Sequence, residues 1–120
     1  VGKMNRNYQK GYAFEVRCKK FLQKKGYQVI RSPSSKGSYD LMAIDDFNKL
    51  FVQCKKTSGT TINVKGMRPV MRDAEKVTGT PLLVYGFQNT PIYSTVITKD
   101  QYIMKRKENH VKVDDFLDLL

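Results

Sequence analysis

The stretch 38–56, SYDLMAIDDFNKLFVQCKK, constrains the fold of this chain more than any other. Apolar residues dominate its segments 39–44 and 50–55, while turn-favouring and polar residues lie between them. This pattern predicts two short strands joined by a tight turn. We place the turn about Asp46 and Phe47, which makes the stretch a β-hairpin.

The hairpin brings three polar side chains together at its open end. A turn about residues 46 and 47 puts Asp40 across from Gln53, and Lys55 follows two residues later. Because strand side chains alternate between faces, Gln53 and Lys55 point the same way. A carboxylate and an amide oxygen are ligands for a divalent ion, and an ammonium group can hold a water or a phosphate. Phosphodiester chemistry is therefore one use of this trio.

The chain has 120 residues and a formal net charge of +11, which predicts one basic domain over residues 1–120. The charge is unevenly distributed. Residues 1–36 hold ten Lys and Arg and one acid, residues 37–72 hold six and three, and residues 73–120 hold six and seven. A basic half that contains the polar trio suits a polyanion such as nucleic acid. A merely soluble, lysine-rich face is the alternative.

The cysteine, histidine and apolar content argues against several other classes of protein. Cys18 and Cys54 are too few for a disulfide scaffold, and a zinc site needs more Cys and His than the chain contains. No apolar run approaches the length of a membrane span, so we expect no membrane association and a cytoplasmic protein. His110 is the single histidine and has no evident partner, which predicts a surface position.

A helix is predicted over residues 7–25, ending at Gly26. Glu15 lies inside its apolar arc and therefore needs a compensating partner. That partner is either Lys19, one turn along the helix, or a metal ion shared with Asp40. The expected members of the buried arc are Tyr8, Tyr12, Phe14, Cys18, Phe21 and Leu22.

The remaining pattern predicts a mixed α/β domain. The further elements that we expect are strands 27–31, 81–87 and 92–97, helices 68–78, 99–107 and 113–120, and a short extended piece at 62–64. The polar loop 32–38 leads to Asp40, where its hydroxyl and N–H groups suit phosphate contact as well as an ordinary surface loop.

Two segments, GYAFEVRCKKFLQKKGYQVIRSPSSKGSYDLMAI and the following FVQCKK, resemble the archaeal-type Holliday junction resolvases of the PD-(D/E)xK nuclease superfamily. The resemblance covers roughly residues 8–87. It implies a restriction-endonuclease-like fold, a mixed β-sheet flanked by helices. It also implies a homodimer that binds branched DNA and resolves four-way junctions by paired nicks.

The resemblance assigns roles to single residues. Glu15 matches the helix glutamate that helps to hold a metal or its water, and Asp40 matches the central metal-bridging aspartate. Lys55 matches the lysine that orients the attacking water. Mg²⁺ is the implied cofactor, with Mn²⁺ as a substitute. The other implied positions are Gln53 and the Cys54 backbone carbonyl as metal ligands, Ser35 near the scissile phosphate, and Arg31, Ser34, Lys36 and Lys56 as nucleic-acid contacts.

Gln53 departs from the family pattern, which usually has glutamate there. Glutamine still offers a carbonyl oxygen to a divalent ion but contributes no charge. Two alternatives to junction resolution follow. One is another nuclease on the same fold, of repair, nicking or restriction type, and the other is a non-catalytic nucleic-acid-binding module. In each case we expect the protein near the nucleoid, or in the host cytoplasm if the chain is viral.

Overall fold

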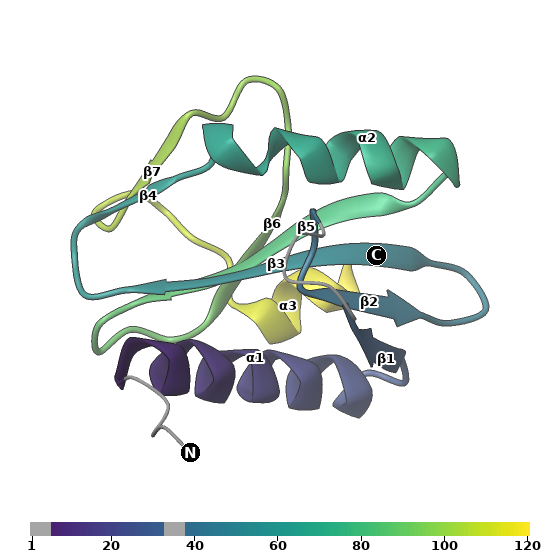
Figure 1. Ribbon diagram of the computed structural model, residues 1–120, viewed down its shortest axis with the longest axis horizontal. Helices are drawn as coiled ribbons and strands as arrows, with labels where there is room; N and C mark the ends of the chain where they lie inside the picture. Colours follow the sequence, from purple (N-terminus) through teal and green to yellow (C-terminus); the bar gives the residue numbers. More distant parts are fainter. Residues whose placement is uncertain (1–5, 33–37) are drawn as a thin grey trace, which may run out of the picture.

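The structure is a computed structural model that describes residues 6–32 and 38–120. Runs of strands lie between its helices along the chain (Figure 1). The elements are α1 (Arg6–Lys24), β1 (Gln28–Arg31), β2 (Leu41–Ile44), β3 (Lys49–Thr57), β4 (Thr61–Asn63), the 3₁₀ turn η1 (Lys65–Met67), α2 (Arg68–Lys76), β5 (Thr80–Phe87), β6 (Tyr93–Val96), β7 (Ile103–Lys105) and α3 (Val113–Asp118).

Five strands form one mixed sheet in the order β1-β2-β3-β5-β6. Only β3 and β5 are parallel within this sheet, and the other neighbours run antiparallel. The β2–β3 hairpin pairs Leu41 with Val52, which confirms the predicted register because Asp40 then falls opposite Gln53. The mixed sheet with helices on both faces confirms the predicted fold class (Figure 1).

Each face of the sheet is covered by helices and has its own apolar cluster. Helices α1 and α3 pack on one face and α2 packs on the other (Figure 1). The strand β5 contributes alternate residues to both, Leu82 and Val84 to the first cluster and Leu83 and Tyr85 to the second. This double burial explains its near-continuous apolar sequence, as predicted.

Helix α1 ends as its sequence predicts. Gly26 has a φ of +95°, the left-handed conformation that glycine adopts without steric cost. Its N–H donates to Gln23 O at 3.0 Å, and the Tyr27 N–H donates to Leu22 O at 3.2 Å. These two bonds form the Schellman motif, which turns the chain directly into β1. The turn sets Arg31, at the end of β1, beside the middle of α1.

The predicted helix over residues 99–107 is wrong. The segment instead contains β7, which pairs with β4 in a second, two-stranded sheet. Met104 lies opposite Ile62 and packs on the cluster beneath α2. A strand partner and a buried side chain therefore outweigh local helix propensity here.

The surface position of His110 was predicted because no partner for it was evident. That reason is wrong, since the side chain has partners. Its Nδ1 lies 2.7 Å from Tyr85 Oη, and its Nε2 lies 2.9 Å from Lys105 O. Since a carbonyl only accepts, we assign the Nε2 proton to the bond with Lys105. The ring stacks on Tyr93 at 4.7 Å between centroids. His110 thus connects the segment after β7 to the sheet. Its hydrogen-bond partner Tyr85 is partly buried, and this burial raises the pKa of the Tyr85 hydroxyl.

Within the described ranges, no helix is both long and apolar enough to cross a membrane.

Candidate active site

The main chain of Asp40 is hydrogen-bonded to the neighbouring chain segments on both sides, β3 and residue 32 after β1. Its N–H donates to Val52 O at 2.8 Å, and its own carbonyl accepts from Ser32 N at 2.9 Å. Its carboxylate Oδ2 accepts from the Cys54 N–H at 2.8 Å. The side chain is therefore held against β3 with a defined direction, beside Gln53 and Lys55.

Glu15 comes from α1, where it lies on the same side as the buried Phe14 and Cys18. Only 21% of its side chain is exposed, and its Oε2 lies 3.2 Å from Arg31 Nε. Arg31 in turn sits over the Tyr12 ring, with Cζ 4.9 Å from the centroid. The structure thus supplies a partner for Glu15 that neither of the two sequence predictions named. Tyr12, expected in the buried arc, is 43% exposed and serves as a platform for that partner.

Burial and like charge act together on the two carboxylates. Partial burial raises the pKa of Glu15, the charge of Asp40 raises it further, and Arg31 opposes both. Burial also raises the pKa of Asp40, against the Cys54 N–H bond and the charges of Arg31 and Lys55. A cation between the two acids would relieve this repulsion and favour their charged forms.

Gln53 takes part in a contact with the chain that leads into Asp40. Its Nε2 donates to the backbone carbonyl of Ser38. The Ser38 hydroxyl donates to Asp73 Oδ2, on α2. Our sequence reasoning missed Asp73. The available signal was its place three residues after Val70, at the edge of the apolar stripe of α2.

Lys55 and Lys56 are exposed and lie near the end of β3. Together with Arg17 of α1 they line a shallow depression of about 740 Å³. No carboxylate is present among the described residues that line it. This depression is a cationic surface next to the carboxylates, which suits a phosphate backbone.

The cysteines lie inward, as their apolar surroundings predict. Cys18 is fully buried and Cys54 packs against the same cluster. Hydrogen bonding to Cys18, followed by burial, raises the pKa of the Cys54 thiol well above its ordinary value. The burial of Cys18 and the raised pKa of Cys54 argue against a cysteine nucleophile. The Cys54 carbonyl as a metal ligand stays a prediction.

Three predicted contacts, Ser34, Ser35 and Lys36, lie outside the described residues. The remaining predicted residues do converge. Glu15, Asp40, Gln53 and Lys55 reach the same end of the β2–β3 hairpin from α1 and two adjacent strands.

The donor set fits a hard divalent ion. The described ranges contain no cluster of three or more Cys, His, Asp and Glu side chains suited to a metal. What they offer is two carboxylates, Glu15 and Asp40, and the amide oxygen of Gln53. Glu15 Oε2 is buried and, apart from its ion pair with Arg31, accepts no hydrogen bond from the described residues. Oxygen ligands with few protein charges are typical of Mg²⁺, which keeps several waters.

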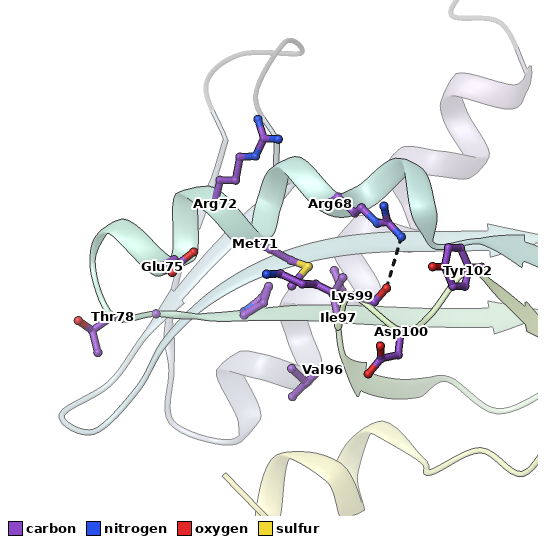
Figure 2. A pocket seen from close by; sticks show the side chains of 12 residues that line it. Arg68, Met71, Arg72, Glu75, Thr78, Val96, Ile97, Lys99, Asp100 and Tyr102 are labelled. Carbon is purple, nitrogen blue, oxygen red and sulfur yellow. Dashed lines mark hydrogen bonds between the residues drawn. The ribbon is translucent and has the colours of Figure 1, made fainter.

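A second hollow lies elsewhere in the described structure, between α2 and the end of β6 (Figure 2). It measures about 1050 Å³ and mixes charges, with Arg68, Lys99 and Asp100 among its lining. Arg68 Nη2 donates to Lys99 O at 3.3 Å across it (Figure 2). None of the predicted site residues lines this hollow, and we place the chemistry at Asp40 because the acids and lysine converge there.

A mixed sheet that carries an aspartate and a lysine on adjacent strands, with a glutamate from the first helix, is the arrangement that the resemblance to PD-(D/E)xK nucleases predicts. Residues 6–120 match the family model described as archaeal Holliday junction resolvase (Hjc). The chain belongs to this family.

Two relatives illustrate the likeness. The crossover junction endodeoxyribonuclease Hjc of Methanocaldococcus jannaschii is 35% identical over 92 residues, which cover 75% of this chain and 68% of that protein. The crystal structure of Hjc from Archaeoglobus fulgidus, a Holliday junction resolvase, superposes with a TM-score of 0.75. It covers 91% of this chain and 96% of its own at 13% identity, which shows a shared fold.

Proposed function

We propose that this protein resolves four-way DNA junctions as a homodimer, by paired Mg²⁺-dependent nicks, with Asp40 at the centre of each site. Family membership supports the substrate class. The arrangement around Asp40 supports the site, because its carboxylate is held by the Cys54 N–H between a half-buried glutamate and a lysine.

The residues that would hold the ion are Glu15 and Asp40, with the Gln53 amide oxygen and the Cys54 carbonyl completing the protein's share. A divalent ion here supplies positive charge to the transition state and activates water for attack on the phosphate. Mn²⁺ shares the preference for oxygen ligands and would substitute.

The chain's own cations act on the DNA. Lys55 is exposed and lies near Asp40, where its positive charge opposes the burial that raises the pKa of Asp40. The Lys55 ammonium can therefore orient a water or stabilise charge on the phosphate. Lys56 and Arg17 extend the same surface, and Arg31 lies beside Glu15 of α1. Contacts of this kind position the backbone without reading sequence.

A dimer follows from the shape of the substrate. A four-way junction presents two symmetry-related strands, and paired nicks require two sites on one two-fold body. DNA as substrate would also place the protein in the cytoplasm at the nucleoid, or in the host cytoplasm for a virus.

The test is cleavage of a labelled four-way junction beside a matched linear duplex, with Mg²⁺ and then with EDTA. We expect symmetric nicks on the junction alone that disappear with EDTA. Asp40→Asn should lower the cleavage rate by about 10³-fold and Lys55→Ala by about 10²-fold, because each removes a group that acts in the transition state. Junction binding should persist in both.

Other outcomes would redirect the proposal. Equal cutting of linear duplex would move the enzyme to a repair, nicking or restriction role. Tight junction binding without cutting in Mg²⁺ or Mn²⁺ would favour the non-catalytic binding module. Normal cleavage by Asp40→Asn and Lys55→Ala would contradict the site itself.

A further inference from the structure

The short segment before Asp40 is held from three directions. The Ser38 carbonyl accepts from Gln53 Nε2 on β3, and the Ser38 hydroxyl donates to Asp73 on α2. Between Ser38 and Asp40, the Tyr39 ring packs edge-on against Phe51, with 5.2 Å between centroids. Each anchor comes from a part of the chain distant in sequence from residues 38–40.

The contact with the Ser38 carbonyl needs a hydrogen-bond donor at position 53. A glutamine side chain can donate from its nitrogen, whereas an ionised glutamate only accepts. A glutamate at this place could not bond the Ser38 carbonyl, since two acceptors would face each other. The amide that departs from the family pattern therefore has a donor function in this chain.

We propose that Gln53, Ser38 and Asp73 form a relay of positioning residues that sets the direction of Asp40. The relay connects α2 and β3 to the segment that leads into β2, through the backbone carbonyl and the hydroxyl of Ser38. None of the three needs to touch the reacting phosphate for this role. Gln53 Oε1 remains available to an ion, and the bond from Nε2 fixes its direction. The inference rests on the proposed function, in which Asp40 is the central catalytic group.

Partial burial explains why the relay can hold. Ser38, Gln53 and Asp73 are all partly buried, so water competes less well for their polar groups than at the surface. Partners that orient a metal ligand typically change metal affinity or activity by about 10- to 100-fold when removed. The relay acts on the same ligand through the backbone, so we expect the lower end of that range.

The first experiment compares Asp73→Ala with Asp73→Asn. Both remove the same charge, but asparagine keeps an oxygen that accepts from the Ser38 hydroxyl. We expect Asp73→Ala to lower the single-turnover cleavage rate by about tenfold with unchanged junction affinity, and Asp73→Asn to stay within about twofold of wild type. Glu75→Ala is the matched control, because Glu75 is an exposed acid on the same helix.

A second readout does not depend on cleavage. Hydrogen exchange of the amides of residues 38–41 should accelerate in Asp73→Ala and stay near wild type in Asp73→Asn and Glu75→Ala. Equal behaviour of alanine and asparagine at position 73, in rate and in exchange, would overturn the relay.

A double-mutant cycle tests whether Gln53 and Asp73 act through the same carbonyl segment. Gln53→Met removes the donor at similar size, and amide exchange of residues 38–41 is measured without metal, so that the loss of the Gln53 oxygen as a ligand does not enter. Exchange in the double variant with Asp73→Ala should be no faster than in the faster single variant. Multiplicative increases in the exchange rate would show independent roles and overturn the proposal. Asp40→Asn separates the two hypotheses, since normal cleavage by that variant refutes the catalytic site, whereas failure of the cycle refutes only the relay.

Discussion

Two carboxylates from opposite faces of the sheet approach the chain around Asp40, and they are satisfied in different ways. Glu15 comes from α1 and pairs with a charged partner, Arg31, whose side chain is 50% exposed. Asp73 comes from α2 and accepts from a neutral hydroxyl, that of Ser38. The negative charge of Asp40 raises the pKa of Glu15, so Glu15 lies close enough to Asp40 to act on the same bound ion.

The difference indicates two kinds of task. An acid that is compensated by an exposed cation can exchange that cation for a metal ion, because the charges balance in both states. An acid bonded to a hydroxyl gains little from an ion but holds a backbone segment in place. We therefore propose that the α1 side binds the metal ion and that the α2 side positions the chain before Asp40.

The largest expected contrast comes from making the same change on both helices. Glu15→Gln should weaken Mn²⁺ binding by more than about tenfold and lower cleavage by about 10²-fold, since it removes a charged ligand. Asp73→Asn should leave both within about twofold, because the hydroxyl keeps its acceptor. Calorimetric titration with Mn²⁺ and single-turnover cleavage measure the two effects. Similar losses on both helices would show that Asp73 also acts through its charge.

Removing the cation beside Glu15 should have smaller effects of opposite sign. In Arg31→Gln we expect Mn²⁺ to bind several-fold tighter, because a competing positive charge is gone. Junction binding should weaken, and its salt dependence should fall by a slope of about 1, as for one lost phosphate contact. Titration calorimetry and junction binding at several salt concentrations measure these changes.

Lys19→Gln is the control for that experiment, since Lys19 is the helix partner that sequence alone suggested for Glu15. It removes one positive charge from the same helix and should leave Mn²⁺ affinity unchanged. If Lys19→Gln tightened the metal as much as Arg31→Gln, general charge would explain the effect, and the specific role of Arg31 would be wrong.

Local patterns predicted much of the fold and of the site. Alternation and turn residues gave the β2–β3 register, and therefore the position of Asp40 opposite Gln53, because a hairpin is a local structure. The failures involve partners distant in sequence. Residues 103–105 become a strand because β4 pairs with them, and His110 finds Tyr85 and Tyr93 only after folding.

Two contacts at the site were not predicted, because their partners also lie on elements distant in sequence. The contact between Glu15 and Arg31 joins a helix to the far end of the next strand, and that between Ser38 and Asp73 spans 35 residues. A helical wheel shows that Glu15 needs a partner but cannot locate one on another element. The sequence likewise placed most of the positive charge in the first half of the chain, but it could not show that Arg17, Lys55 and Lys56 line one depression between α1 and β3.

The smallest expected effect concerns Tyr12, which holds the Arg31 guanidinium over its ring. A cation–π contact at an exposed site contributes about 0.5–1 kcal/mol, so its loss changes an equilibrium by roughly two- to fivefold. In Tyr12→Leu, Arg31 loses the ring that holds it beside Glu15 and should compete less well with an ion there. Mn²⁺ binding should then tighten by that factor, in the same direction as in Arg31→Gln, whereas Tyr12→Phe keeps the ring and should match wild type.

The double variant Tyr12→Leu with Arg31→Gln decides whether the ring acts through the arginine. Without the guanidinium, the leucine should have no further effect on Mn²⁺ affinity, and the double variant should titrate like Arg31→Gln alone. A further change in Mn²⁺ affinity in the double variant would mean that Tyr12 supports α1 directly. The exchange of cations at Glu15 would then depend on helix packing, and the division of tasks between α1 and α2 would lose its electrostatic basis.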